Sequence, residues 1–532
     1  MLKKKWLVAT SAFLIVPTLS LPFLGGSHAS TTPRIVREEL NGYYEAIKAD
    51  NNDVYTGDFK DGCYDGTGRI EYADGSVYEG EWKAGKREGY GVFTSTANWT
   101  YEGNFSANVK SGSGKCTFFD GSTYDGNWSN DIPNGEGTFT AADGSEIKGA
   151  WENGVKNGTA IKLYPDGSSY NGQWKDDMPN GTGTYKSAEG WSYVGGFKNG
   201  IKSGKGKMNY TDGSVYDGEW KNNARNGKGT YTFSDDSIYS GNWSDDVLTG
   251  KGVLTSCEGW VYDGSFVNGI RTGNGKLTYA DGSTYTGAFK DNLFDGKGVL
   301  ESSEGWKYDG QWAKGLKSGE GIYTRSDGSV YTGTWANNME NGKGVYEDHA
   351  GWKYDGQWKN GVKEGSGTLT LADKSTYVGN FVNDVQSGKG KMTSSDGWSY
   401  DGEWKYGQKN GYGVYLYADG SKYEGNWQSD LETGSGTYSD ISGWSYSGNW
   451  CDGERNGNGK LTYVDTSYYD GEWVDNLKNG YGIQTYHNET GVYFGTYEGQ
   501  FVDGKREGYG VFKYESGYVQ NGNWNNDSFT GE

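Results

Sequence analysis

The chain has 532 residues, of which 33% are hydrophobic and 92 are glycine, a glycine content more than twice the usual ~7%. This composition argues against a conventional buried core, while 22 Trp and 44 Tyr are far too many for a disordered or collagen-like polymer. The net charge of -20 disfavours nucleic acids and anionic lipid surfaces as partners. We therefore expect an ordered protein that is built from glycine and aromatic rings.

Residues 1–29 have the features of a secretory signal peptide. Three lysines at 3–5 precede an apolar stretch over 6–24, and small residues at 27 and 29 suit cleavage after Ala29. An uncleaved membrane anchor is the alternative, but two prolines interrupt the apolar stretch and favour cleavage. The sequence therefore predicts a secreted or cell-surface protein.

Residues 30–54 form a leading segment before the main body of the chain. Thr32 and Pro33 precede a charged, partly apolar stretch that ends at Lys48, a pattern that predicts a short capped helix, although Gly42 weakens it. We interpret this segment as an N-terminal cap for the main body of the chain.

A repeat of 23 residues fills the chain from residue 55 to residue 532. The pattern Tyr-x-Gly-x-Trp/Phe begins at Tyr55 and recurs every 23 residues through Tyr469, and Ile147 is the one starter in that series that is not Tyr. Five extra residues near His487 precede a further copy at Tyr497, and a truncated copy begins at Gln520. The chain thus contains about 21 copies.

Numbering each repeat from its first residue as position 0 shows which positions are restricted. Positions 2 and 11 are always Gly, position 4 is always Trp or Phe, and position 13 is Gly except for Ala160. Fourteen Trp residues occupy position 4, seven occupy position 21, and Trp6 lies in the signal segment. Every Trp in the chain is therefore accounted for, and none marks a separate site.

The segment from Tyr216 to Trp220, with Gly227-Lys228-Gly229 after it, resembles the MORN (membrane occupation and recognition nexus) repeat. The resemblance covers residues 55–532 in a single phase. It implies successive β-hairpins in one long antiparallel sheet, and roles in scaffolding, self-association or membrane tethering.

A compensation between positions 17 and 21 indicates how the hairpins pair. Position 17 is often aromatic when position 21 is Ser, as at Tyr72 and Ser76, whereas Trp99 at position 21 accompanies Ser95 at position 17. The two positions would therefore face each other across a short Asp-Gly loop. Position 15 would then oppose the next position 0, position 13 the next position 2, and position 11 the next position 4.

This register places the rings of positions 0, 4, 15 and 17 or 21 on one face and the polar positions 1, 3, 12 and 14 on the other. Lys207 should then neighbour Asp217, and Lys391 should neighbour Asp401. We expect Gly at positions 2, 11 and 13 to let Trp rings lie close to the backbone. The fold class is therefore all-β, an elongated single-layer antiparallel sheet of about 21 stacked hairpins.

The sequence offers little material for catalysis. Outside the signal segment His349 and His487 are the two histidines, and the four cysteines are too far apart in the repeat array to pair. Neither a calcium-binding loop nor a phosphate-binding loop occurs in the sequence. We therefore expect a protein that is not an enzyme and that uses no cofactor and no metal.

The leading hypothesis is a non-enzymatic scaffold that binds a protein, a glycan or another copy of itself through its aromatic and glycine face. Membrane-lipid binding of the MORN type and a passive structural spacer are the alternatives. The candidate binding residues are tryptophans of positions 4 and 21, namely Trp220, Trp243, Trp260, Trp306, Trp312, Trp352, Trp358, Trp398 and Trp404.

Overall fold

The computed structural model describes residues 40–488 and 490–532, so the signal segment lies outside the described residues. Every regular element in the described part is a β-strand, and there are 43 of them. The chain divides into two compact units after Ala280, with β1–β21 in the first and β22–β43 in the second.

The strands of the first unit have the following bounds: β1 Gly42–Lys48, β2 Val54–Lys60, β3 Cys63–Glu71, β4 Val77–Lys83, β5 Lys86–Thr94, β6 Thr100–Ser106, β7 Val109–Thr117, β8 Thr123–Ser129, β9 Ile132–Thr140, β10 Glu146–Glu152, β11 Val155–Leu163, β12 Ser169–Lys175, β13 Met178–Lys186, β14 Ser192–Lys198, β15 Ile201–Asn209, β16 Val215–Lys221, β17 Ala224–Thr232, β18 Ile238–Ser244, β19 Val247–Thr255, β20 Val261–Val267 and β21 Ile270–Thr278.

The strands of the second unit are β22 Thr284–Lys290, β23 Leu293–Glu301, β24 Lys307–Ala313, β25 Leu316–Thr324, β26 Val330–Ala336, β27 Met339–Glu347, β28 Lys353–Lys359, β29 Val362–Thr370, β30 Thr376–Val382, β31 Val385–Thr393, β32 Ser399–Lys405, β33 Gln408–Leu416, β34 Lys422–Gln428, β35 Leu431–Ser439, β36 Ser445–Cys451, β37 Glu454–Thr462, β38 Tyr468–Val474, β39 Leu477–His487, β40 Tyr493–Val502, β41 Lys505–Tyr514, β42 Val519–Asn525 and β43 Ser528–Gly531.

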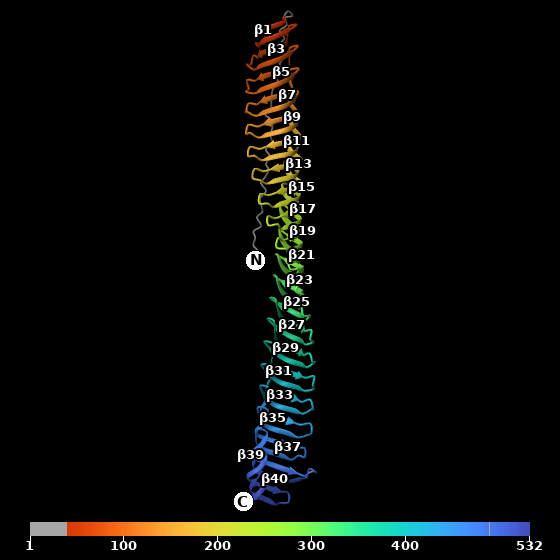
Figure 1. The fold of residues 1–532 in the computed structure, drawn as a ribbon, viewed down its shortest axis with the longest axis vertical. Helices are drawn as coiled ribbons and strands as arrows, with labels where there is room; N and C mark the ends of the chain where they lie inside the picture. Colours follow the sequence, from red (N-terminus) through yellow and green to blue (C-terminus); the bar gives the residue numbers. More distant parts are fainter. Residues whose placement is uncertain (1–39, 489) are drawn as a thin grey trace. The chain divides into compact units, whose positions relative to one another are not determined.

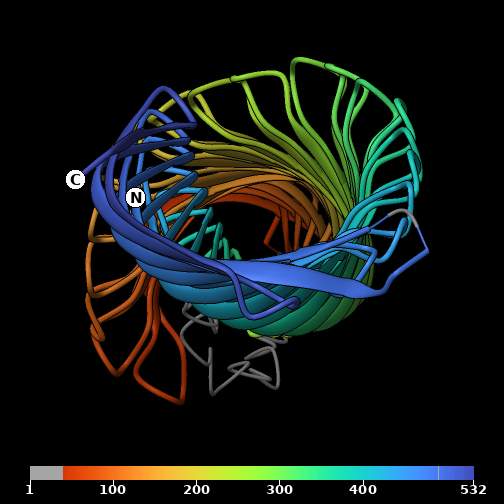
Figure 2. The same cartoon turned by 90° about the horizontal axis from the view of Figure 1, so that it is seen from below.

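Within each unit, consecutive strands pair antiparallel and stack in chain order (Figure 1). Seen along the stack, the strands of each unit turn progressively, as the right-handed twist of extended chains requires (Figure 2). The all-β class and the antiparallel sheet of hairpin repeats that the sequence predicts are therefore confirmed.

One repeat is one hairpin plus the loop to the next. In the repeat that begins at Tyr216, a two-residue turn joins β16 to β17, and the loop over 233–237 joins β17 to β18. Both turn residues, Asn222 (φ 52°) and Asn223 (φ 68°), are left-handed, as a type I′ turn requires and as Asn tolerates. The repeat thus alternates a tight turn with a longer loop.

The predicted register is confirmed. In the pairing of β15 with β16, Met208 at position 15 opposes Tyr216, Gly206 opposes Gly218, and Gly204 opposes Trp220. The predicted polar neighbours Lys207–Asp217 and Lys391–Asp401 are also cross-strand partners. Positions 17 and 21 close the longer loop through a backbone hydrogen bond, 2.8 Å from the Ser256 N–H to the carbonyl of Trp260.

The core of each repeat is the position 0 tyrosine lying over two facing glycines. Tyr216 is fully buried, and a Cβ built on Gly229 would stand 2.3 Å from its hydroxyl oxygen. Gly218 and Gly229 are cross-strand partners, so the ring rests on bare backbone on both strands. The phenol donates a 2.9 Å hydrogen bond to the carbonyl of Glu219, and burial raises the phenol's pKa.

This geometry corrects the expected role of the glycines. The ring that needs bare backbone is the Tyr of position 0, whereas the Trp of position 4 meets that Tyr edge-on, with centroids 5.2 Å apart for Tyr216 and Trp220. Gly227 at position 11 is left-handed (φ +72°), and a Cβ there would meet the Glu219 carboxylate on the polar face. Position 11 is therefore glycine because of its backbone conformation and the side chain of position 3.

The two exceptions in the repeat pattern, at position 0 and at position 13, occur in the same hairpin and are structurally linked. Ile147 replaces the tyrosine of position 0 in the same hairpin in which Ala160 replaces the glycine of position 13, and Ala160 pairs with Gly149. Ile147 and Ala160 are both buried, at 3% exposure each. Without a ring above it, position 13 accommodates a methyl group.

The N-terminal segment differs from its prediction. Its described part contains strand β1, which pairs with β2 from Gly42↔Phe59 to Lys48↔Val54, so the helix expected to run to Lys48 is wrong there. The edge of β2 offers unpaired backbone groups, and pairing with them outweighs the weak local preference for a helix. Tyr44 of β1 also packs edge-on against Phe59, with centroids 5.5 Å apart.

The five-residue insertion lies in the longer loop between two hairpins, β38–β39 and β40–β41, and leaves the register of the ring positions intact. β39 and β40 extend to 11 and 10 residues, and they pair from Gly480↔Phe501 to Tyr486↔Gly495. The extra residues therefore extend the loop end of the β39–β40 pair, where the register shifts between Tyr486 and His487, and do not shift the ring positions.

We expect Gly229→Ala to destabilise the hairpin by about 1–3 kcal/mol, because the new methyl group would force the Tyr216 ring off the backbone. Hydrogen exchange of the amides of β16–β18 in the full chain measures the local loss.

The natural Ile147–Ala160 hairpin supplies the control. In a Tyr216→Ile background, Gly229→Ala should cost at least about 1 kcal/mol less than in the wild-type chain. Equal costs in the two backgrounds would show that the tyrosine ring is not what requires glycine.

Candidate binding face

We define the aromatic face as the sheet surface that carries positions 0, 4, 9, 15 and the ring of position 17 or 21. Position 0 and position 4 form its deepest rows. Tyr216 meets Trp220 of its own repeat and Trp243 of the next, with centroids 5.2 and 5.3 Å away. Each tyrosine thus joins two repeats.

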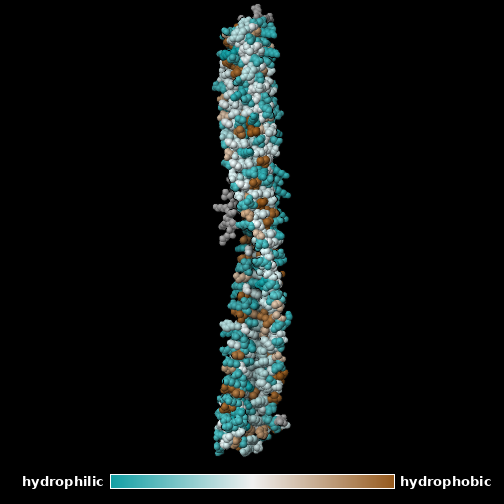
Figure 3. All heavy atoms as spheres, viewed as in Figure 1, coloured by the Kyte–Doolittle hydropathy of each residue, from teal (hydrophilic) through white to brown (hydrophobic). Residues whose placement is uncertain are grey.

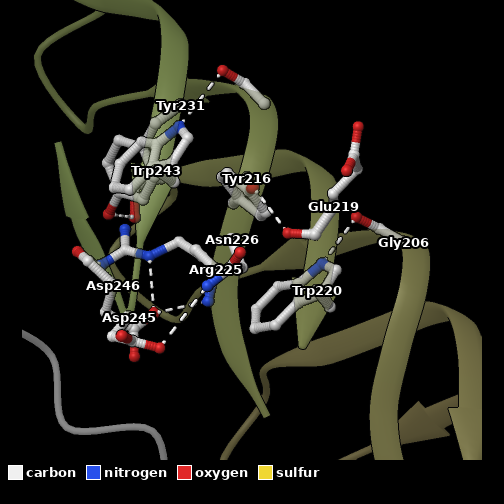
Figure 4. A network of polar contacts seen from close by, with 12 residues as sticks. Gly206, Tyr216, Glu219, Trp220, Arg225, Asn226, Tyr231, Trp243, Asp245 and Asp246 are labelled. Carbon is white, nitrogen blue, oxygen red and sulfur yellow. Dashed lines mark hydrogen bonds and ion pairs between the residues drawn. The ribbon is translucent and has the colours of Figure 1, made fainter. Parts of the chain in front are cut away.

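The predicted binding tryptophans fall into two structural groups. The five at position 4 donate their indole N–H to the carbonyl of position 13 in the preceding repeat, at 2.9 Å for Trp220 and Gly206 (Figure 4). Four of them are buried and the fifth is half-buried: Trp220, Trp243, Trp312 and Trp358, then Trp404. This group belongs to the packed interior of the sheet.

The four candidates at position 21 are half-buried at the ends of the longer loops: Trp260 in the first unit, and Trp306, Trp352 and Trp398 in the second. Trp444 continues this series in the second unit. Each packs against a ring of position 15 where such a ring exists, with centroid distances of 4.7 Å for Trp352–Tyr346 and 5.5 Å for Trp398–Tyr415. Their indoles keep part of their surface in solvent.

Position 9, which the sequence analysis did not single out, adds a row of cations to the aromatic face. Its side chains lie between the rings, as shown by the Arg225 guanidinium, which stands 4.4 Å from the Trp243 centroid and 5.1 Å from that of Tyr231 (Figure 4). Cation–π contacts of this kind also involve Lys110, Lys156, Lys202, Lys317, Lys363, Lys409, Arg455, Lys478 and Arg506.

An Asp or Asn at position 7 of the next repeat fixes many of these cations. Asp246 accepts hydrogen bonds from both the backbone N–H and the Nε of Arg225 at 2.9 Å, and its carbonyl accepts one from the guanidinium at 3.1 Å (Figure 4). Arg455 makes the same three contacts with Asn476. The pair therefore fastens one hairpin to the next.

A sequence signal for this pair exists. Eleven repeats carry Asp or Asn at position 7, and position 9 of the preceding repeat is then always Lys or Arg. When position 7 is Gly, the preceding position 9 carries no positive charge, as for Leu248 and Gly269, with the exception of Lys478 and Gly504 beside the insertion. The correlation spans 21 residues of sequence and becomes visible when adjacent repeats are compared.

The two units differ in how deeply position 9 is buried. In the first unit Lys110, Lys156 and Lys202 are 1–6% exposed, and burial lowers the pKa of Lys202 to about 8, whereas Arg87 and Arg271 are half-buried. In the second unit the cations from Lys317 to Arg455 are half-buried, and so are Glu340, Gln386 and Glu432 between them. The aromatic face of the second unit thus offers polar groups that a ligand can reach.

Within the described residues, His, Cys, Asp and Glu do not gather in any group of three or more that could hold a metal ion. A search of the same residues for helices found none long and apolar enough to span a bilayer. The aromatic face combines rings, cations and a few acceptors, a set of groups suited to binding.

These features define an open β-hairpin repeat protein. A family model described as "MORN repeat" matches twenty segments between residues 55 and 517, so the chain belongs to the MORN repeat family. The resemblance inferred from the sequence is thereby confirmed. A search of curated proteins found no match.

Solved structures show more distant similarity. The TCP10 domain of Danio rerio CPAP is 13% identical, and the match covers 38% of this chain and 91% of that one with a TM-score of 0.21. In complex with a peptide of Danio rerio STIL, the same domain matches at 13% identity over 47% and 96% of the two chains, with a TM-score of 0.20. Virginiamycin B lyase from Staphylococcus aureus is 10% identical over 55% and 94%, with a TM-score of 0.10. Scores this low carry no argument about function.

We expect Asp246→Gly to destabilise the junction between its two hairpins by about 2–3 kcal/mol, because it leaves a largely buried Arg225 without its carboxylate. The left-handed backbone at Asp246 (φ 67°) suits glycine, so backbone strain does not contribute. Hydrogen exchange of β17–β19 amides reports the change.

Combining Asp246→Gly with Arg225→Leu reproduces the natural Leu248–Gly269 pairing and should restore most of the lost protection. A double variant as unstable as the single one would show that the cation and the carboxylate do not act as a unit.

Proposed function

We propose that the protein is an exported, non-enzymatic repeat scaffold that binds a partner through the half-buried tryptophans of its aromatic face. The observation that carries this proposal is the series Trp306, Trp352, Trp398 and Trp444, one indole on every second longer loop of the second unit. The partner would be a protein, a glycan or a second copy of the chain.

The burial of the two tryptophan groups supports the choice of the loop series. Trp220 and Trp312 are 4% and 6% exposed and give their indole N–H groups to the backbone, so they have little left to offer a ligand. The loop tryptophans present rigid aromatic surface at low conformational cost, which is what binding sites use. We therefore assign binding to the loop tryptophans and structural support to those of position 4.

Export is proposed from the sequence of residues 1–29, with its lysines, its apolar stretch and its small residues before the cleavage position. In an exported chain, the aromatic face would meet cell-surface material or other secreted molecules.

Attachment to a lipid surface is the second candidate, and a specific observation favours it. Position 8 is the first residue of the second strand of each hairpin, and it often carries an exposed apolar side chain. Examples, 38–46% exposed, are Leu293, Leu316, Met339 and Leu431. These residues form an apolar ridge along the two-residue turns, although hydrophobic residues on the face in Figure 3 lie in small separate patches. The net charge of -20 opposes anionic headgroups.

Two variants of the full mature chain separate these candidates. Replacing Trp306, Trp352, Trp398 and Trp444 by Ala should weaken binding to surface extracts of the producing cell by at least about tenfold, since indoles often dominate binding energy. Retention of labelled protein on immobilised extract measures the effect, and far-UV circular dichroism checks the fold.

The matched control replaces Leu293, Leu316, Met339 and Leu431 by Ser and should bind the extract as the wild type does. Sedimentation with neutral and acidic vesicles tests the second candidate. Vesicle binding that the ridge variant abolishes would replace the proposal with lipid attachment. Folded variants that both bind like the wild type would overturn the assignment to the loop tryptophans, and a wild-type chain that binds neither extract nor vesicles would leave a passive spacer.

A further inference from the structure

The loop tryptophans of the second unit form a row with a regular period. Trp306, Trp352, Trp398 and Trp444 are each 46 residues apart and immediately precede β24, β28, β32 and β36. Four strands separate one indole from the next, a local spacing of roughly 19 Å. The row is thus a one-dimensional array of similar sites.

The repeat after each tryptophan of the row carries a cation at position 9. Lys317, Lys363, Lys409 and Arg455 follow the four tryptophans by 11 residues, and all of them are half-buried on the aromatic face. The ammonium groups of Lys317 and Lys363 stand 5.6 Å from the centroids of Trp306 and Trp352. A hydrogen-bond donor therefore lies close to these indole surfaces.

Acceptors alternate with these donors. Position 9 of the intervening repeats carries Glu340, Gln386 and Glu432, which are also half-buried. In the first unit the matching stretch has Pro133, Pro179 and Leu248, so the donor and acceptor alternation is a property of the second unit. The row thus combines aromatic surface with donors and acceptors at fixed intervals.

Several charged groups of the row already have polar partners. The Lys363 ammonium lies 3.5 Å from the Asp384 carboxylate, and the Glu340 carboxylate lies 3.6 Å from the Arg325 guanidinium. Glu432 accepts a 3.2 Å hydrogen bond from the Tyr417 hydroxyl. The whole chain carries a charge of -20, which repels polyanions. These features favour an uncharged ligand that is rich in hydroxyl groups.

The period favours a ligand with a repeating structure. The cores of protein interfaces are depleted of charged residues, whereas this row alternates its rings with charged and polar side chains. A pyranose offers a C–H face that stacks on indole, and hydroxyls that both donate and accept hydrogen bonds. A polysaccharide presents these groups at regular intervals.

We propose that the row Trp306–Trp352–Trp398–Trp444, with the polar side chains of position 9 between its members, binds an uncharged linear polysaccharide. This inference rests on the proposed function and names the class of its ligand. The tryptophans supply the stacking surfaces, and the side chains of Lys, Arg, Glu and Gln bind the hydroxyl groups.

The direct test measures retention of the mature full chain on cellulose, chitin and starch, and the quenching of its tryptophan fluorescence by soluble xylan, glucomannan and dextran. At least one uncharged polymer should bind, with little change between ~50 and ~500 mM NaCl because no net charge is paired. Binding to alginate or pectate alone, or to none of these polymers, would overturn the inference.

Variants locate the site. Replacing all four tryptophans by Ala should weaken binding at least about tenfold. The combination of Glu340→Leu, Gln386→Leu and Glu432→Leu should also weaken it by about tenfold, while the fold tolerates leucine at position 9 as it does at Leu248. The matched control, Trp99→Ala with Trp191→Ala on loops of the first unit, should bind like the wild type. Equal binding by the wild type and both test variants would overturn the inference.

Treating the cell-surface extract separates failure of this inference from failure of the proposed function. Binding that depends on the row, survives protease and is lost after periodate cleavage of sugar diols supports a polysaccharide. Binding that depends on the row but is lost to protease and survives periodate would keep the proposed scaffold and exclude the polysaccharide. Extract binding that does not depend on the row would remove both.

Discussion

The contact on which the whole sheet depends is that of a tyrosine ring lying flat over two paired glycines. A Cβ at either glycine would stand within 3 Å of the ring or of the facing backbone, so the contact excludes every other residue at those positions, as for Gly218, Gly229 and Tyr216. The ring then meets one indole or phenyl of its own repeat and another from the next. Order in one repeat therefore requires its neighbour.

This sharing decides which side chains are left for function. The tyrosines of position 0 and the tryptophans of position 4 pack in the core, and the indole N–H of Trp220 already donates a hydrogen bond to the carbonyl of Gly206. The longer loops are closed by their own backbone hydrogen bonds, so a tryptophan at position 21 is free to present part of its ring. The loops can thus vary from repeat to repeat without disturbing the stack, and function can reside there.

Much of the fold was predictable because the repeat supplies many copies of the same evidence. The exchange of a ring between positions 17 and 21 indicated the loop, and the loop determined the register of Gly206 with Gly218. Strand β1 was not predictable, because its pairing with β2 is a tertiary interaction that the local sequence does not encode. The ring over the glycines was predicted to be the tryptophan of position 4 and is the tyrosine of position 0, as at Tyr216, because both rings lie on the same face and the pattern does not separate them.

The candidate site was predictable in part. Composition and period identified the tryptophans as candidates. Only the structure shows that Trp312 is buried in the core whereas Trp306 is half-buried and accessible to a ligand. The cations of position 9 were missed because their partners, such as Asp246 for Arg225, lie in the next repeat and single-repeat comparison does not connect them. The greater exposure of position 9 in the second unit depends on local packing, which the sequence pattern does not reveal.

The central claim is that repeats are ordered collectively through shared rings. It is tested most directly by measuring circular dichroism and urea unfolding for polypeptides of one, two, four and eight consecutive repeats that begin at Tyr216. The account predicts that one repeat is unfolded, that order begins at about three repeats, and that the free energy of unfolding then grows by a constant increment per added repeat. A folded single repeat, or a stability that does not depend on repeat number, would contradict it.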